Sequence, residues 1–280
     1  MVFIYHEVSD WPSEFNRVFG LNVRPSVFAR HLDVIQRAFT IIDPGRLLAG
    51  DYPRPAALIT FDDGNLSYFR NALPLLKARG IPSVAFLNLG PIRGEVCWSG
   101  VVTYLARCDA NFARSGAAGT GDYTEFGEAD VRRYLESVDG DAVLDRARRF
   151  RGAIATETEI AAVATDPLVS LGNHLYNHYN ATLLGDRLRE EFWKNQQILD
   201  DHPRGIRFFS YPFSRQNAAT LQEIRAEGAE AVFTAGGLPN TNGTADLYYR
   251  VELPDRVLGE QELISEVLKR YLPATMRRIL

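Results

Sequence analysis

The stretch AALITFDDG, residues 56–64, decides the fold, because six uncharged residues run directly into two carboxylates and a glycine. A continuous run of this kind is typical of a parallel strand buried on both faces. In α/β folds, catalytic groups collect at the carboxyl ends of such strands. Neighbouring strand residues point to opposite sides, so Asp62 and Asp63 are able to serve two different partners, a metal and a proton. The alternative is that Asp-Asp-Gly only makes a turn and caps the next helix.

Composition indicates one globular domain over residues 1–280. The apolar share is 46% and the formal net charge is −4, which suits a single barrel-sized domain and gives no reason to expect a nucleic-acid partner. Charged and turn residues interrupt every apolar run, so we expect no integral membrane segment. The first residues, MVFIYHEVSD, lack the features of a signal peptide, which indicates a cytoplasmic protein or a leader absent from this sequence. Cys97 and Cys108 match no zinc or redox spacing and are expected to be free or buried thiols.

Short apolar runs alternate with amphipathic segments, which predicts parallel strands joined by helices. The predicted strands are Val2–Tyr5, Thr40–Ile42, Ala57–Phe61, Ser83–Leu89, Leu168–Leu171, Phe208–Tyr211, Ala231–Thr234 and Tyr248–Leu253. The predicted helices between them include Pro25–Ala38, Ser67–Arg79, Arg187–Leu199 and Leu221–Glu227. Seven or eight such strands favour an α/β barrel over an open sheet, and the glycine-rich loop of a nucleotide-binding fold is absent.

Residues from about 95 to 165 break this alternation. They contain a small-residue stretch, Ser115–Gly121, and a charged helical pattern, Glu128–Arg149. We interpret the segment as a helical insertion or lid on the same domain, because no linker composition marks a boundary. The tail Glu260–Leu280 is predicted to be a surface helix with a basic end.

Two histidines, His174 and His178, follow the predicted strand around Leu171. At spacing i and i+4 both imidazoles reach one metal if the turn is helical. Together with Asp63 they form a site of two histidines and one carboxylate, which leaves open positions for water and substrate. Asp62 then remains as the general base.

A further strand ends in Phe209-Ser210-Tyr211-Pro212-Phe213. Proline after Tyr211 presents the backbone rigidly at the barrel mouth, and the Tyr211 N–H is then able to bind an oxyanion. An ordinary strand end with core aromatics is the alternative.

These three motifs, TFDDG, His-x3-His after a strand and Tyr-Pro after the next strand, resemble those of the polysaccharide deacetylases, the NodB-like domain of carbohydrate esterase family 4. The resemblance covers nearly the whole chain. It implies a distorted (β/α) barrel of about seven strands and a divalent metal, with zinc as the first candidate. It also implies Asp62 as the base, Asp63, His174 and His178 as metal ligands, and the Tyr211 backbone in the oxyanion hole.

The sequence departs from the family pattern at several positions. Leu175 replaces the usual Ser or Thr after the first histidine, and no histidine follows His202, where the late catalytic acid usually stands. The usual Arg before Tyr-Pro lies closer to the tyrosine than Arg207 does, so Arg250 on a late strand rivals Arg207 as the partner of the base. Arg250 is also a candidate for substrate binding. His202 is expected in a surface loop.

Tyr5-His6-Glu7-Val8 resembles the Tyr-His-x-Val start of the subgroup that deacetylates poly-N-acetylglucosamine, in which an amino-terminal histidine supplies the acid. His6 is therefore the expected proton donor for the leaving amine. His31 is expected at the edge of the core. Trp98, in the insertion, is a candidate for stacking on a sugar, with packing as the alternative.

The resemblance therefore implies a metal-dependent hydrolase that removes N-acetyl groups from oligo- or polysaccharides containing N-acetylglucosamine. One alternative keeps the site and changes the substrate to a small cyclic amide or a lipid-linked amino sugar. Another is a sugar-binding domain without catalysis. The metal-ligand set accepts zinc, cobalt, nickel or iron.

Overall fold

Seven parallel strands close into a barrel in this structure, a computed structural model that describes residues 1–114, 128–236 and 247–271. In pairing order the strands are β1 (Val2–Tyr5), β5 (Ala56–Phe61), β6 (Ser83–Leu87), β7 (Val169–Asn173), β8 (Gly205–Ser210), β9 (Ala231–Ala235) and β10 (Tyr248–Glu252). Strand β1 closes the ring, because Phe3 is in register with Ile59 of β5 on one side and with Val251 of β10 on the other. The predicted (β/α) barrel of about seven strands is confirmed.

Three short strands lie outside the ring. The run predicted at Thr40–Ile42 is β4 (Thr40–Ile41), which pairs only with the beginning of β5. Strands β2 (Glu7–Val8) and β3 (Asn22–Val23) pair with each other after the chain leaves β1. This excursion carries helix α1 (Glu14–Phe19) to the mouth of the barrel.

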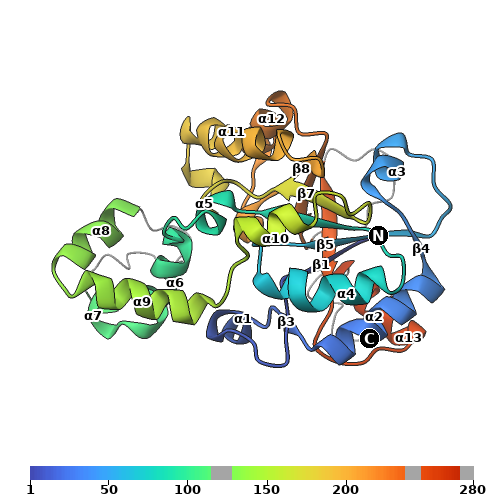
Figure 1. The fold of residues 1–280 in the computed structure, drawn as a ribbon, viewed down its shortest axis with the longest axis horizontal. Helices are drawn as coiled ribbons and strands as arrows, with labels where there is room; N and C mark the ends of the chain where they lie inside the picture. Colours follow the sequence, from blue (N-terminus) through green and yellow to red (C-terminus); the bar gives the residue numbers. More distant parts are fainter. Residues whose placement is uncertain (115–127, 237–246, 272–280) are drawn as a thin grey trace.

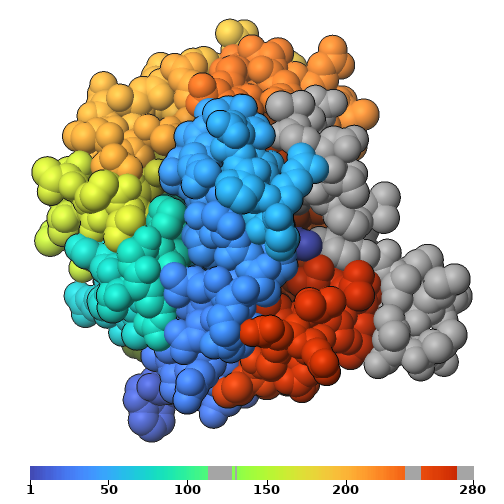
Figure 2. Space-filling model, turned by 90° about the vertical axis from the view of Figure 1, so that its right-hand side faces the viewer, coloured from blue at the N-terminus to red at the C-terminus, as the bar shows by residue number. Residues whose placement is uncertain are grey.

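Helices surround the barrel (Figure 1). Outside the insertion they are α1, α2 (Pro25–Ala38), α3 (Pro44–Ala49), α4 (Leu73–Lys77) after the π-helical turn η1 (Tyr68–Ala72), α5 (Leu89–Ile92), α11 (Arg187–Asp200), α12 (Ala218–Ala226) and α13 (Glu260–Tyr271), with short 3₁₀ turns η3 (Ala181–Leu183) and η4 (Pro212–Ser214). Figure 2 shows α2 in blue against α13 in red on one face. The part of the predicted tail helix beyond Tyr271 lies outside the described residues. No helix in the described part of the chain is both long and apolar enough to cross a membrane.

The alternation of side chains along each strand separates two cores. Leu58, Phe86, Phe208 and Phe233 belong to one buried cluster, which fills the barrel, and Ile59 belongs to another, which packs against the outer helices. Thr60, Ser210 and Arg250 are buried toward the carboxyl ends of the same strands. The barrel interior therefore changes from apolar to polar at the end where the two aspartates lie.

The helical insertion lies between β6 and β7 and extends to one side of the barrel (Figure 1). It contains α6 (Trp98–Cys108), α7 (Ala110–Arg114), α8 (Glu128–Glu136), α9 (Gly140–Arg151) and α10 (Glu157–Ala162). The predicted small-residue stretch Ser115–Gly121 lies outside the described residues. The insertion has a hydrophobic cluster of its own, formed by Trp98, Val101, Val102, Leu105, Phe112, Val131, Val143 and Ala147.

Candidate active site

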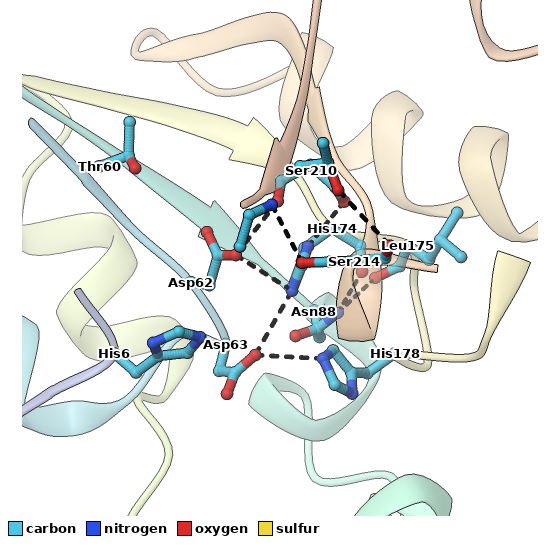
Figure 3. Close-up of polar contacts among 12 residues, drawn as sticks. His6, Thr60, Asp62, Asp63, Asn88, His174, Leu175, His178, Ser210 and Ser214 are labelled. Atoms are coloured by element: carbon cyan, nitrogen blue, oxygen red, sulfur yellow. Dashed lines mark hydrogen bonds and ion pairs between the residues drawn. The ribbon is translucent and has the colours of Figure 1, made fainter. Parts of the chain in front are cut away.

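Asp63, His174 and His178 meet at the carboxyl end of the barrel (Figure 3). Asp63 follows β5 and His174 follows β7, two strands of the ring that are separated by β6. The Asp63 Oδ1 atom lies 3.4 Å from His174 Nε2 and 3.2 Å from His178 Nε2. All three side chains are buried. The sequence prediction that these residues come together is confirmed; their role as ligands stays a prediction.

The three donors fit a single divalent ion. Ligands bound at about 2.1 Å lie roughly 3.0–3.4 Å apart when the angle at the metal is between octahedral and tetrahedral. In both histidines the other ring nitrogen is occupied: His174 Nδ1 lies 2.7 Å from the Ser210 carbonyl oxygen, and His178 Nδ1 lies 3.2 Å from Ser99 Oγ. A proton on Nδ1 leaves the lone pair of Nε2 for a metal.

The electrostatics keep Asp63 ionised. Burial alone raises the pKa of its carboxyl group. His178, hydrogen bonds from both histidines and the Arg151 guanidinium outweigh burial and hold this pKa well below its ordinary value. Asp63 therefore carries a negative charge at neutral pH, as a metal ligand would need.

Asp62 is held by Arg250. The guanidinium donates from Nη1 to Asp62 Oδ1 at 2.7 Å and from Nη2 to Asp62 Oδ2 at 2.6 Å, and Ser210 Oγ donates to Oδ2 at 3.1 Å. Burial raises the pKa of Asp62. Arg250 and then His174 lower this pKa by more than burial raises it, so the carboxyl group is ionised. His174 Nε2 lies 3.7 Å from Asp62 Oδ2, which places the candidate base beside the candidate metal site.

The competition between the two arginines is resolved in favour of Arg250. Arg207 instead pairs with the half-exposed Asp200 at 2.7 Å, away from the site. Arg250 was also a candidate for substrate binding, and that role stays a prediction. The Arg250 side chain is fully buried and its donors are directed at Asp62, Ser210 and Thr60.

The backbone at the site is strained. All non-glycine residues with positive φ in the described chain lie in loops at this end of the barrel: Asp63 (73°), Leu175 (59°), His178 (56°), Phe213 (56°) and Ser214 (55°). Such conformations cost on the order of 1–3 kcal/mol each and persist only where the surroundings impose them. The strain therefore marks the same loops that carry the candidate ligands.

Side-chain amides hold the histidine loop in place of the usual Ser or Thr. Asn88 Nδ2 donates to the carbonyl oxygens of His174 and Leu175, the latter at 3.0 Å. Asn173 Oδ1 accepts from the Leu175 N–H at 2.9 Å. The departure at Leu175 is thus compensated by two asparagines.

A cavity of about 260 Å³ opens above the site. Its lining includes Asp62, Asp63, His174, His178, His6, Glu252 and the apolar residues Phe15, Phe19, Leu21 and Phe213. His6 approaches from the side opposite to His178 (Figure 3). Its Nδ1 is buried with no hydrogen-bond partner in the described structure, and the nearest carboxylate oxygen, Glu252 Oε1, lies 3.6 Å away. This places an imidazole at the cavity wall, with a carboxylate near its Nδ1 atom.

Neither the Tyr211 N–H nor the Trp98 ring is directed into the cavity, where a substrate contact was predicted for each. The Tyr211 N–H donates to the carbonyl oxygen of Phe233 at 3.0 Å, while the Tyr211 residue itself lines the cavity, so its role in an oxyanion hole stays a prediction. Trp98 is 9% exposed within the cluster of the insertion, with the Arg132 guanidinium 4.1 Å from its ring centroid. It packs between helices and does not line the cavity.

Sequence reasoning missed several residues of the site. Glu252 shares the inward face of β10 with Arg250, so the alternation in YYRVEL was a usable signal. Ser99 and Arg151 come from the insertion, and no local pattern distinguishes them. The two remaining histidines are His31, which is buried in the core, and His202, which lies in the turn after α11 as predicted.

A parallel barrel with acidic and histidine side chains at the carboxyl ends of its strands is typical of a class of hydrolases. Residues 49–232 match the family model described as polysaccharide deacetylase, and the chain belongs to this family. The predicted enzyme class, a hydrolase that removes N-acetyl groups from carbohydrate, is confirmed. The search of curated proteins finds no match.

Solved structures share the fold. IcaB from Ammonifex degensii is 22% identical with a TM-score of 0.61, covering 90% of this chain and 91% of that one. The Streptococcus pyogenes deacetylase PplD, solved in complex with acetate, is 16% identical with a TM-score of 0.64, covering 97% of both chains. The de-N-acetylase from Aggregatibacter actinomycetemcomitans is 16% identical with a TM-score of 0.63, covering 95% and 98%.

Proposed function

We propose that the protein removes N-acetyl groups from saccharides containing N-acetylglucosamine, with the help of a divalent metal, zinc being the first candidate. One observation carries the proposal: Asp63, His174 and His178 form a compact donor set directly beside Asp62, at the floor of a cavity that also contains His6. A divalent ion bound there would polarise the acetyl carbonyl group and acidify water.

Asp62 is placed to accept a proton from the attacking water. Its two oxygens are fixed by Arg250 and Ser210, so the carboxylate does not need to reorient during the reaction. The water oxygen forms a bond to the acetyl carbon as its proton moves to Asp62.

His6 is placed to complete the reaction. When the carbon–nitrogen bond breaks, the leaving amine needs a proton, and the imidazole at the cavity wall supplies it. Glu252 lies on the Nδ1 side of the ring, with its Oε1 atom 3.6 Å from that nitrogen. The products are acetate and a saccharide with a free amine.

The apolar residues Phe15, Phe19 and Leu21 at the cavity wall support a sugar substrate, since they offer apolar surface to the faces of a pyranose ring. PplD, a fold relative, was solved with acetate, which is the acid released in the proposed reaction.

The test is acetate release from N-acetylated oligosaccharides of varied length, measured together with metal content. Asp62→Asn is expected to abolish release while metal content is retained, and chelation is expected to abolish release reversibly. Asp201→Asn, on the exposed turn after α11, is the matched control. Near wild-type release by Asp62→Asn, or activity untouched by chelation, would contradict the proposal. Turnover only of a lipid-linked amino sugar would reassign the substrate.

A further inference from the structure

Two of the three candidate ligands are held from outside the barrel. The residues that hold them, Ser99 and Arg151, both belong to the helical insertion, on α6 and α9. His174 is held by the barrel itself, through the Ser210 carbonyl oxygen. The insertion therefore contacts the site through the partners of Asp63 and His178.

Arg151 controls which oxygen of Asp63 faces the histidines. Its Nη2 donates to Asp63 Oδ2 at 3.1 Å, and its Nη1 donates to Asn65 Oδ1 at 2.9 Å. The Arg151 side chain is 7% exposed and its guanidinium lies 4.8 Å from the ring centroid of Phe15. With Oδ2 occupied, Oδ1 is the oxygen directed at both histidines.

Ser99 controls the ring of His178. Its Oγ lies 3.2 Å from His178 Nδ1. When Nε2 is the ligand atom, Nδ1 carries the proton and the serine oxygen accepts it, which fixes both the tautomer and the ring orientation.

The part of the insertion formed by α6 to α9 has a hydrophobic core of its own. Its hydrophobic cluster, around Trp98 and Leu105, is distinct from the barrel clusters. A cavity of about 340 Å³ lies at the junction. It is lined by Ile92 and Ile154, which pack in or against the cluster between the barrel and its outer helices, and by Val101 of α6 and Leu144 of α9. Apolar packing leaves this space at the junction, and Phe150 of α9 also packs on Phe15 of α1, with ring centroids 6.0 Å apart. The polar contacts of Ser99 and Arg151 link the insertion to the site itself.

We propose that docking of the helical insertion and metal binding are coupled through Ser99 and Arg151, which act as positioning residues. The docked insertion raises metal affinity, and by thermodynamic reciprocity a bound metal stabilises the docked insertion. The inference rests on the metal site of the proposed function and assigns the insertion a role in it.

The experiment measures Zn²⁺ affinity by competition with a chelator, together with hydrogen exchange of backbone amides with and without Zn²⁺. In the wild-type protein, Zn²⁺ is expected to slow exchange in α6 and α9 as well as around Asp63 and His178. Arg151→Gln and Ser99→Ala are each expected to weaken Zn²⁺ binding by about 10- to 100-fold. Both are also expected to lose the protection of α6 and α9.

Matched variants separate position from charge and from folding. Arg149→Gln changes an exposed arginine of the same helix and is expected to behave as wild type. Arg151→Lys keeps the charge without the two-pronged contact and is expected to recover only part of the affinity. Co²⁺ absorption spectra are expected to change in Arg151→Gln and Ser99→Ala, because the ligand arrangement changes. If Arg151→Gln does not fold, Arg151→Lys and Ser99→Ala carry the test.

Wild-type affinity in both Arg151→Gln and Ser99→Ala, or Zn²⁺ protection confined to the barrel loops of the wild-type protein, would overturn the coupling. Either result would leave the proposed function intact. A wild-type protein that binds no metal would instead remove the metal from the proposed function and the coupling with it.

Discussion

Replacing Arg250 by methionine is expected to destabilise the protein because it leaves the Asp62 carboxylate buried without its counter-ion. Asp62 is 3% exposed, and Arg250 supplies two charged hydrogen bonds to it, at 2.6 and 2.7 Å. Removing one partner of a buried ion pair costs about 3–5 kcal/mol. This is a large part of the roughly 5–15 kcal/mol by which proteins are stable, and it corresponds to a fall of roughly 1–2 M in the urea midpoint.

A second substitution, Asp62→Asn, separates the effect of the unpaired charge from the loss of the Arg250 side chain. In Asp62→Asn/Arg250→Met the orphaned charge is gone, so the double variant is expected to be more stable than Arg250→Met alone, although it lacks the base. The assay is urea unfolding followed by circular dichroism, with chelator present so that metal does not contribute. Arg207→Met is the control and is expected to cost about 1 kcal/mol or less, because its ion pair with Asp200 is partly exposed. A cost below 1 kcal/mol for Arg250→Met, or a double variant no more stable than Arg250→Met, would refute the explanation.

Three further predictions follow from the site and the core. His6→Ala is expected to lower kcat by about 10²- to 10⁴-fold with little change in metal content. Glu252→Gln is expected to lower kcat by less. Unchanged kcat in His6→Ala would contradict the role of His6 as the acid. Trp98→Leu is expected to lower the thermal stability of the protein and to leave KM unchanged, since the indole packs within the insertion; a raised KM with unchanged stability would restore the stacking role. Burial lowers the pKa of His31 despite its 2.8 Å contact with the Arg256 carbonyl oxygen. The unfolded chain therefore binds a proton more readily than the folded protein, and the free energy of unfolding falls as pH drops below about 6.5. In urea unfolding at pH 7.5 and 5.5, His31→Gln is expected to lose less stability over this interval than the wild type, and an equal loss would contradict the prediction.

The barrel strands were predictable because parallel strands buried on both faces leave long apolar runs. AALITF coincides with β5, and the other six strands of the ring were also found from such runs. Thr40–Ile42 was predicted equally well as a strand, but nothing in its sequence shows that it pairs only with the beginning of β5 and stays outside the ring.

The candidate ligands were predictable because each motif is local. Asp62 and Asp63 are adjacent, and His174 and His178 lie within a single loop, so the sequence places them together without knowledge of the fold. Their outer partners are not local: Arg151 is 88 residues from Asp63 in the chain. The two interpretations of Trp98 could not be separated for a related reason, because an indole that stacks on sugar and one that packs between helices look alike until the helices are placed.

The contact between Arg250 and Asp62 spans 188 residues of sequence and is made possible by the pairing of the first strand with the last. During synthesis, at about 5–20 residues per second, a chain that has already produced Asp62 waits on the order of 10 to 40 s for its counter-ion. Until then the acidic pair has no buried environment to occupy, and the ring has an open edge between β1 and β9. The ring therefore closes and the site forms in one late step. Incomplete chains that end before β10 are expected to lack the complete site however much of the barrel they contain.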